Sequence, residues 1–407
     1  MTRGPHARRP FVAVAPVFAL LVALASCSSD EAGGVGTTAV LDQPSTSVAA
    51  ATTEASVAEA PTTAASTTVA PTTLAPSTTL ASPTGDVFPG VEWATADLPA
   101  DVDQAALDVA VEVAFGAPDA ASRVQSIVVV RGGEIVYERY HPLDTADEIM
   151  NSYSVSKSIT SAVIGLLVSD GRLDVDERAP IDAWADPADP RHEITLEHLL
   201  HMTSGLQWAE EYSANSQALA MLQAENASAY VASFPLEAEP GTMFDYSTGT
   251  TAILAGIAID TVGGVDEFEA YLEERLLDPL GITSTELLHD GSGRWFGGLG
   301  ANYTTRDFAR FGLLYLNDGI WDGDRILPEG WVEYSRTASP SNEGYGAQWW
   351  LAAGNAFEAR GLYGQFIHVN PDHDLVIAIN TTQGGDAGTL LTATPEAFGA
   401  TEPAAVL

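Results

Sequence analysis

Residues 28–85 limit what this chain can fold into more than any other feature, because they lack the side chains that build a hydrophobic core. The segment consists mainly of Ala, Pro, Ser and Thr, with a loose Pro-Thr-Thr repeat in "APTTAASTTVAPTTLAPSTTL", and it contains no aromatic residue. Such a segment cannot bury enough apolar surface to offset the entropy that is lost on ordering. The sequence therefore predicts a disordered tether over 28–85, a folded domain over 86–395 and a short tail over 396–407.

The first 27 residues have the pattern of an export signal. A basic stretch, "MTRGPHARRP", precedes fifteen apolar residues, "FVAVAPVFALLVALA", which are too few for a comfortable bilayer span. The segment ends in "LASC", whose Cys27 is the only cysteine of the chain and excludes an intramolecular disulfide. It resembles the bacterial lipobox, which implies an exported lipoprotein anchored at Cys27, on the outer face of the bacterial cytoplasmic membrane or elsewhere in the cell envelope. A chance run of small residues before a cysteine is the alternative.

The charge balance restricts the possible partners. The chain has 55 acidic and 17 basic residues, which give a formal charge of −38. A surface this acidic repels phosphate backbones and anionic lipid headgroups. We therefore expect no nucleic-acid partner, and we expect contact with a membrane only through the N-terminal anchor. The acidity itself fits a solubility device or an adaptation to salt.

The folded part carries strand patterns at both ends and helix patterns between them. Residues 127–140 alternate around Gly132-Gly133 and predict a β-hairpin, while apolar residues over 154–171 keep helical spacing. Further helices are predicted over much of 195–280 and at 303–316, and further strands at 345–351, 364–370 and 375–380. This order predicts an α+β fold, in which one antiparallel sheet built from both termini is flanked by helices and carries an inserted helical subdomain.

A serine and a lysine stand three residues apart at the start of the first of these helices. In "NSYSVSKSITSAVIGLL", Ser154 and Lys157 share a helix face, and Lys157 is the only lysine in the chain. A desolvated lysine can lose its proton near neutral pH, whereas arginine does not deprotonate in proteins. The free amides of the first helical turn would favour negative charge beside the serine. The alternative is a solvated helix lysine, but every other basic residue here is arginine.

Ser-x-x-Lys is also the first motif of the penicillin-recognising serine hydrolases. Four more blocks follow it in order: "ITLEHLLHMTSGLQW", "EPGTMFDYSTGTTAILAGIAI", "YTTRDFARFGLLYLNDGIWDGDRILPEGWV" and "GLYGQFIHVNPDHDLVIAIN". From about residue 122 to about residue 382, the chain resembles the serine β-lactamase and penicillin-binding-protein-like superfamily. Within that superfamily, it is most similar to the branch of esterases and 6-aminohexanoate-dimer hydrolases. The resemblance implies a β-lactamase/transpeptidase-like fold.

The resemblance also implies roles for particular residues. Ser154 is the expected nucleophile and Lys157 the general base of an acyl transfer, with Tyr246 relaying a proton to the leaving group. The backbone amides of Ser154 and Gln365 are the expected oxyanion hole. This chemistry requires no cofactor and no metal. From spacing alone, Tyr246 could equally be a packing residue near a helix start.

Two departures from the family pattern bear on the substrate. Thr248 stands where many relatives have asparagine, and Leu362, Tyr363 and Gly364 align with the Lys-Thr-Gly element of penicillin-binding proteins. No cation remains in that alignment to hold a substrate carboxylate, so we expect a small, uncharged ester, amide or peptide-like substrate. Thr248, Tyr363 and Gly364 are expected to contact it. Trp208 and Tyr212 are candidates for the cleft rim, with packing as the equal alternative.

The sequence also contains patterns that bear on other sites and functions. No Gly-x-Ser-x-Gly occurs, so the nucleophile elbow of an α/β-hydrolase is absent. His192, His198 and His201 do not form an established zinc pattern, and the Gly-rich residues 297–300 fit a loop near the cleft better than a dinucleotide site. The remaining alternatives are a β-lactamase or D,D-carboxypeptidase of the same fold, and a surface binding protein that keeps the fold without turnover.

Overall fold

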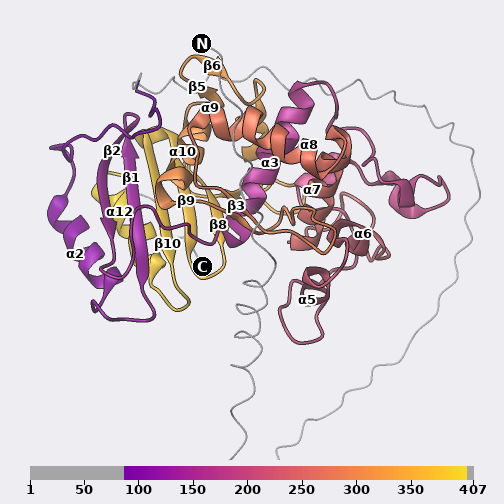
Figure 1. Ribbon diagram of the computed structural model, residues 1–407, viewed down its shortest axis with the longest axis horizontal. Coiled ribbons are helices and arrows are strands. Elements are labelled where there is room, and N and C mark those ends of the chain that lie inside the picture. The colour runs from indigo at the N-terminus through magenta and orange to yellow at the C-terminus, as the bar shows by residue number, and fades with distance from the viewer. Residues whose placement is uncertain (1–86, 401–407) are drawn as a thin grey trace, which may run out of the picture.

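The computed structural model describes residues 87–400, and its centre is a six-stranded sheet (Figure 1). All neighbouring strands in the sheet are antiparallel, in the order β2-β1-β10-β9-β8-β7. The strands are β1 (Val124–Arg131), β2 (Glu134–Tyr140), β7 (Trp350–Leu351), β8 (Phe357–Gly361), β9 (Gln365–Asn370) and β10 (Leu375–Thr381). Because β1 pairs with β10, the two ends of the described chain meet in one sheet. The predicted α+β class and the sheet built from both termini are confirmed.

The two central strands are covered on both faces. β1 ("VQSIVVVR") and β10 ("LVIAINT") are apolar runs that are almost entirely buried. Since successive side chains of a strand point to opposite faces, Val128 and Val130 enter one hydrophobic cluster while Ile127 and Val129 enter the other. A near-continuous apolar run is the pattern expected for a strand with packed layers on both sides.

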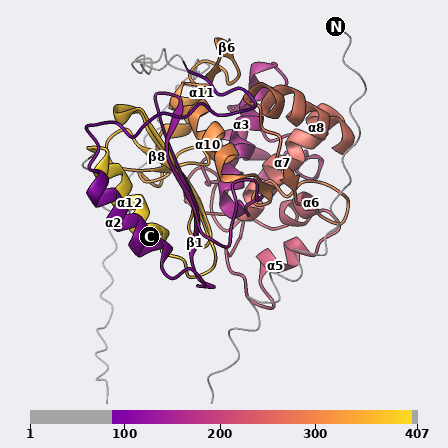
Figure 2. The same ribbon diagram turned by 60° about the vertical axis from the view of Figure 1, so that its left-hand side comes forward.

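Two helices from opposite ends of the chain cover one face of the sheet. α2 (Gln104–Phe115) and α12 (Ala387–Ala397) lie side by side there, as Figures 1 and 2 show. The chain continues beyond α12 with Phe398 and Ala400, which are both buried. The packed part of the chain therefore runs a few residues past the boundary at 395 that the sequence predicts.

The other face of the sheet carries α10 (Thr305–Leu316), and the rest of the helical part lies beyond it (Figure 1). This helical part is inserted between β2 and β7, as the sequence predicts. Its helices are α3 (Ser156–Ser169), α4 (Leu196–Leu200), α5 (Gln217–Leu222), α6 (Ala227–Ala232), α7 (Thr248–Val262), α8 (Val265–Leu272), α9 (Asp278–Leu280) and α11 (Trp331–Arg336). A π-helical turn, Glu273–Leu277, joins α8 to α9. The two-residue strands β3 (Glu286–Leu287), β4 (Ala301–Asn302), β5 (Ile320–Trp321) and β6 (Asp324–Arg325) form two small ribbons.

The starts of these helices are set by short polar side chains. Thr195, Ser216, Asn226, Ser247 and Thr304 precede α4, α5, α6, α7 and α10, and each accepts a hydrogen bond from an amide of the first turn. Such caps satisfy amides that have no partner inside the helix. The cap at Ser247 fixes where α7 begins. It therefore also fixes the positions of its two neighbours, Tyr246 and Thr248, relative to the helix.

α3 and α7 form the centre of the helical part. Most of their residues are buried, including the small polar ones, and the two helices pack against each other. Within residues 87–400, no single helix is long and apolar enough to cross a membrane. α7 has the length and apolar composition of a membrane span only when it is taken together with Val265–Leu280, and the chain bends by 97° between the two segments.

Gly165 allows α3 to pack closely against α11. A Cβ atom at this position would lie 2.6 Å from the indole ring of Trp331, a side chain with no exposed surface. Gly165→Ala is therefore expected to lower the free energy of unfolding by about 1–3 kcal/mol, despite the better helix propensity of alanine. Chemical denaturation would measure this, with Gly90→Ala as the control because a Cβ there meets nothing within 4 Å. A variant at 165 as stable as the wild type would contradict the packing.

Most predicted elements agree with the structure, one predicted strand is shorter than expected, and strand β8 was not expected. The hairpin at 127–140, the helices at 154–171 and 303–316, and the strands at 364–370 and 375–380 all occur. The strand predicted at 345–351 is limited to Trp350–Leu351, since the chain before it forms turns around Tyr345. Strand β8 was not predicted, because "FEARG" has neither alternation nor an apolar run.

Candidate active site

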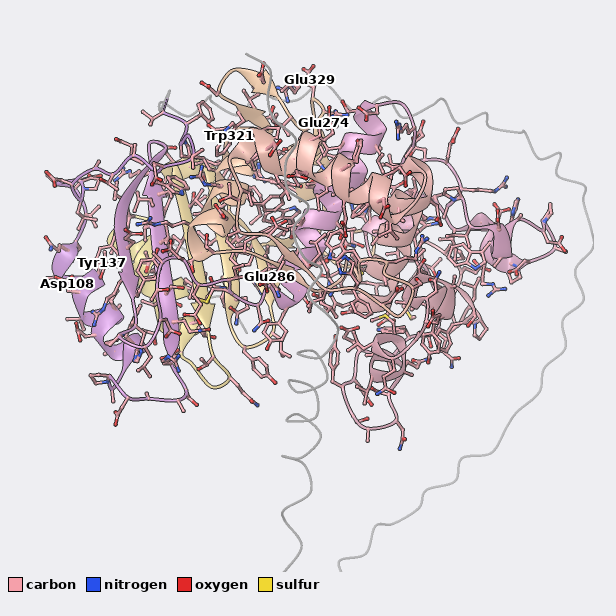
Figure 3. The ribbon with its side chains drawn as sticks, viewed as in Figure 1. Asp108, Tyr137, Glu274, Glu286, Trp321 and Glu329 are labelled. Carbon is pink, nitrogen blue, oxygen red and sulfur yellow. The ribbon has the colours of Figure 1, made fainter. Side chains whose placement is uncertain are left out.

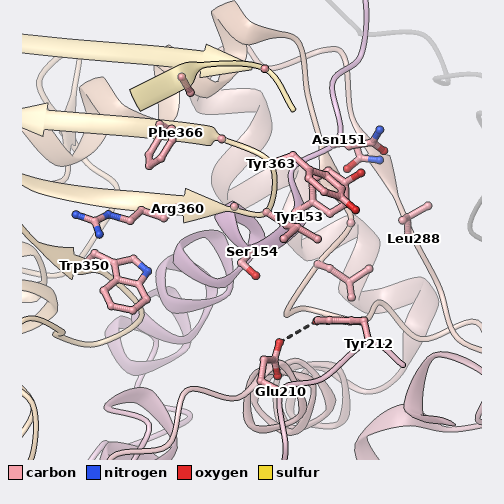
Figure 4. Close-up of a pocket in the computed structure, with 18 of the residues that line it drawn as sticks. Asn151, Tyr153, Ser154, Glu210, Tyr212, Leu288, Trp350, Arg360, Tyr363 and Phe366 are labelled. Carbon is pink, nitrogen blue, oxygen red and sulfur yellow. Dashed lines mark hydrogen bonds between the residues drawn. The ribbon is translucent and has the colours of Figure 1, made fainter. Parts of the chain in front are cut away.

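Ser154 lies in a tight turn immediately before α3. The 3-10 turn Tyr153–Val155 leads into the helix, and Tyr153 has a φ of 44°, a left-handed conformation that is rare for a residue with a side chain. Strained backbone of this kind clusters at functional sites, where the surrounding structure must hold it. Ser154 lines a cavity and lies at the start of the helix, as Figure 4 shows.

Lys157 is buried directly beneath Ser154. Its Nζ atom donates to Ser154 Oγ at 2.9 Å, to Thr248 Oγ1 at 2.8 Å and to the carbonyl oxygen of Gly298 at 3.1 Å. Burial lowers the pKa of this amine to about 8, and the negative charge of Glu210 works against that lowering. A lysine with this pKa is neutral in part of the molecules near pH 7–8, so it can accept the proton of Ser154.

Tyr246 lies next to both groups. Its ring centroid is 4.8 Å from Lys157 Nζ, and its hydroxyl shares a hydrogen bond with the Ser154 side chain. Burial raises the pKa of Tyr246 well above its ordinary value, although the hydrogen bond to Ser154 lowers it in part. The phenol therefore keeps its proton at neutral pH, which suits a donor to a leaving group. The structure thus brings Ser154, Lys157 and Tyr246 together.

Thr248 contacts the amine rather than the cavity. It is fully buried in the first turn of α7, where its Oγ1 accepts from Lys157 and donates to Glu210. The sequence suggested Thr248 as a substrate contact, and this is corrected here because the side chain does not reach the cavity wall. The hydroxyl instead supplies the acceptor that Lys157 needs at the place where many relatives carry asparagine.

Glu210 is a member of the site that the sequence did not reveal. It accepts hydrogen bonds from the Trp208 indole at 2.7 Å, from the Tyr212 hydroxyl at 2.8 Å and from the Thr248 amide at 2.8 Å. Residues 208, 210 and 212 alternate in sequence, and in an extended chain this puts them on one side. This alternation is the one sequence pattern that places Glu210 beside the two aromatic residues, but three positions are too few to predict a site.

The two aromatic residues beside Glu210 have different places. Tyr212 lines the cavity, as predicted for the cleft rim, and Figure 4 shows its hydroxyl bonded to Glu210. Trp208 is buried, packs edge-on against Phe234 and does not line the cavity. Its predicted place at the rim is therefore corrected to the packing alternative.

The cavity above Ser154 has a volume of about 930 Å³ and lies between the sheet and the helical part. Glu286, which lies between these two parts in Figure 3, belongs to its wall, as do the apolar side chains of Leu287, Leu288 and Leu299. The chain from Gly384 to Gly388 forms another part of the wall. A mainly apolar cavity with a few polar groups is typical of a small-molecule site.

The residues aligned with the third family element form a turn, not a strand. Leu362, Tyr363 and Gly364 connect β8 to β9 and line the cavity, with Tyr363 at a φ of 67° and in edge-on contact with Tyr153. Gly361 comes so close to the turn before Ser154 that a Cβ atom would lie 2.5 Å from the Ser152 carbonyl oxygen. Gln365 is buried at the start of β9 and is not among the residues of the cavity wall.

The histidines considered as a zinc site lie apart from Ser154 and Lys157, whereas the Gly-rich loop 297–300 contacts the site. His192, His198 and His201 have separate partners, namely the Trp184 carbonyl, the Thr195 backbone and side chain, and the Thr337 carbonyl. No cluster of metal-binding side chains occurs within residues 87–400. In the Gly-rich loop, Gly298 accepts from Lys157, while Leu299 and Gly300 line the cavity.

With this geometry in view, comparison with known proteins identifies the family. The beta-lactamase family model matches residues 115–400. The chain belongs to the beta-lactamase family. The suspected superfamily and the β-lactamase/transpeptidase-like fold are therefore confirmed, and the chain is a member of a family of serine hydrolases.

Three known proteins illustrate what the chain is similar to in sequence or in fold. The 6-aminohexanoate-dimer hydrolase of Paenarthrobacter ureafaciens is 29% identical over an alignment of 299 residues, which covers 64% of this chain and 74% of that protein. The octameric penicillin-binding protein homologue from Pyrococcus abyssi is 18% identical, with a TM-score of 0.59 over 73% of this chain and 78% of its own. EstCE1, a hydrolase with promiscuous acyltransferase activity, is 16% identical, with a TM-score of 0.58 over 72% of this chain and 98% of its own. The two structural likenesses establish the fold alone.

A cation borders the cavity of this beta-lactamase-family site outside the three residues that align with the third element. It is Arg360 on β8, which lines the cavity (Figure 4). Its Nε donates to Glu358 at 2.6 Å, and its guanidinium lies 5.3 Å from the centroid of the Trp350 indole. Arg360 precedes the aligned residues by two positions, so the motif comparison did not include it.

Proposed function

We propose that this protein is an exported, lipid-anchored serine hydrolase that cleaves a small ester or amide through an acyl-enzyme on Ser154. The observation that carries this proposal is the contact between the buried Lys157 amine and Ser154 Oγ at 2.9 Å. This lysine is buried and hydrogen-bonded to the serine, and its pKa is lowered to about 8. It can therefore act near neutral pH as the general base that activates the serine.

The reaction follows from the positions of the three side chains. Ser154 Oγ attacks the substrate carbonyl carbon while its proton passes to Lys157 Nζ. The tetrahedral intermediate then breaks its bond to the leaving group, which takes the Tyr246 hydroxyl proton, and Tyr246 is reprotonated from Lys157. Water attacks the resulting acyl-enzyme by the same route in reverse order, which releases the acid and restores Ser154.

The oxyanion is stabilised by two backbone amides. The amide of Ser154 lies at the N-terminal end of α3, where free N–H groups favour negative charge. For the second donor we favour the amide of Leu362 over the predicted amide of Gln365. Leu362 follows the close approach of Gly361 to the nucleophile turn and belongs to the cavity wall, whereas Gln365 does not.

The test is a substrate screen on residues 86–407 with Ser154→Ala as the control. We expect hydrolysis of short-chain esters or amide oligomers by the wild type and its loss in the variant, since the nucleophile is removed. Labelling with a fluorophosphonate should be lost in parallel. Unchanged hydrolysis by a folded Ser154→Ala variant would show that the nucleophile is another residue.

A β-lactamase or D,D-carboxypeptidase remains the second candidate, and Arg360 is the observation that favours it. Its side chain keeps 20% of its surface exposed at the cavity, so a cation is present that could pair with a substrate carboxylate. Glu358 already neutralises much of this charge, and we therefore still expect neutral acyl substrates to be preferred over nitrocefin. Faster turnover of nitrocefin that is lost in Arg360→Gln would favour the second candidate instead.

The anchor is proposed from Cys27, which lies outside the described residues. Cys27→Ala removes the thiol that would carry the lipid, so the variant should appear in the medium or accumulate unprocessed. Membrane fractionation of cells that express the full chain measures this, with Ser28→Ala as the control. Normal processing and retention in the membrane by Cys27→Ala would contradict the anchor.

A further inference from the structure

The carboxylate of Glu210 is bonded to four donors, and all of them are neutral. They are the Trp208 indole, the Tyr212 hydroxyl, and the amide and hydroxyl of Thr248. The charge of Glu210 therefore acts on Lys157 across a single hydroxyl, that of Thr248, which contacts both groups. Glu210 also belongs to the cavity wall.

The hydroxyl of Thr248 has only one proton, and Glu210 decides where it points. An ionised carboxylate can only accept hydrogen bonds, so Thr248 must be the donor in its contact with Glu210. The oxygen of Thr248 must then accept from Lys157 Nζ, which lies 2.8 Å away. The direction of this hydrogen bond is therefore fixed by a residue that does not contact the amine.

This direction matters most when Lys157 is neutral. A neutral amine has two N–H bonds and one lone pair, and two of its three contacts here are to obligatory acceptors: Thr248 Oγ1 and the carbonyl oxygen of Gly298. The lone pair is left facing Ser154 Oγ, as a general base requires. Without Glu210, the Thr248 hydroxyl would no longer have a fixed acceptor: it could donate to the Tyr212 hydroxyl, 3.2 Å away, or to that lone pair, and in the second case it would turn the lone pair away from Ser154.

We propose that Glu210 is a positioning residue that orients the Thr248 hydroxyl and so keeps the lone pair of neutral Lys157 aimed at Ser154. The inference rests on the proposed function, because it needs Lys157 to be the base. According to this inference, the reaction also depends on Glu210, a residue that lies outside the Ser-x-x-Lys and Tyr-x-x elements.

The charge of Glu210 gives the inference a second signature. The titratable groups around it are Lys157, Tyr212, Tyr246, Asp245 and Tyr345, and its charge acts on all five. On Lys157 it works against burial, so its removal leaves the pKa of the amine lower still. The acid limb of the pH profile should then move to lower pH. Asp245, whose pKa burial raises to about 6, titrates in a separate range.

The first experiment measures kcat and KM for a neutral ester from pH 5.5 to 10 in Glu210→Gln. We expect the midpoint of the acid limb to fall by about one pH unit and the plateau kcat to fall roughly tenfold, with KM within about twofold of the wild type. Glu211→Gln is the matched control, because it makes the same chemical change at the neighbouring, exposed residue. It should leave the profile unchanged.

The second experiment varies the hydroxyl itself. Thr248→Ser keeps an oxygen that can accept from Lys157 and donate to Glu210, and should retain activity within a few-fold. Thr248→Val removes that oxygen and should lose kcat at least as strongly as Glu210→Gln. If Glu210→Gln does not fold in a thermal melt, this pair decides the question, and equal activity of the two variants would overturn the proposal.

Two results with folded Glu210→Gln would also overturn it. One is an unchanged pH midpoint with unchanged kcat, and the other is a raised KM with unchanged kcat, which would make Glu210 a substrate contact. Failure of the proposed function is distinguishable, because then Ser154→Ala would keep its activity. If Ser154→Ala is inactive and Glu210→Gln is unaffected, only the positioning role of Glu210 is contradicted.

Discussion

Replacing Lys157 with arginine is expected to lower kcat/KM by about 10²- to 10⁴-fold without unfolding the protein. Arginine keeps the positive charge but cannot release its proton, so it cannot take one from Ser154. A lysine that served only as a charge should tolerate this change, since all other basic residues of the chain are arginine. The comparison therefore separates a base from a counter-charge.

The pH profile of the wild type gives an independent check of the same role. Because burial lowers the pKa of Lys157 to about 8, the fraction of neutral amine rises with pH through this value. The activity kcat/KM should rise with it, with a midpoint near pH 8, and should level off above. The rise of kcat/KM with pH is the direction expected for a base that is inactive when it is protonated.

Two controls make the Lys157 result decisive. Lys157 is fully buried, so the larger guanidinium could disturb the packing, and Lys157→Met provides a neutral side chain of similar length. Both variants should be folded in thermal melts and inactive on an active ester. Near-wild-type turnover by folded Lys157→Arg, or an activity that does not change between pH 6 and 9, would contradict the mechanism.

The fold was predictable where one local pattern decides the structure. The hairpin around Gly132-Gly133, the apolar spacing of α3 and the strand pair β9–β10 were all visible in the sequence. Strand β8 was not, because its position depends on pairing with β9 and on the space beside the nucleophile turn. Its short, mixed sequence carries no period of its own.

The site divides in the same way. Ser154 and Lys157 are three residues apart on one helix, so their contact follows from helix geometry. Glu210 and Arg360 reach the site from segments far away in the chain, and only the tertiary fold brings them there. Thr248 shows the intermediate case: the family motif gave its position, but its contact with Lys157 rather than the cavity depends on how α7 packs on α3.

Removal of the Tyr246 hydroxyl is expected to affect substrates with poor leaving groups most. The phenol shares a hydrogen bond with Ser154 and keeps its proton at neutral pH, because burial raises its pKa. A proton donor helps in proportion to the basicity of the group that leaves. Tyr246→Phe should therefore lower kcat about 10²- to 10³-fold for an alkyl ester or an amide, and much less for a nitrophenyl ester.

Phenylalanine suits this test because it retains the ring. The aromatic contacts of Tyr246 with Tyr345 and Trp350, and its position over Lys157 Nζ, do not need the hydroxyl. A loss of activity would therefore report the missing proton and not a collapsed wall. The measurement is kcat for a series of esters of one acid that differ only in the leaving alcohol, plotted against the pKa of that alcohol. The slope should be steeper for the variant than for the wild type. If the two lines are parallel, Tyr246 does not protonate the leaving group, and the proton must come from Lys157 directly.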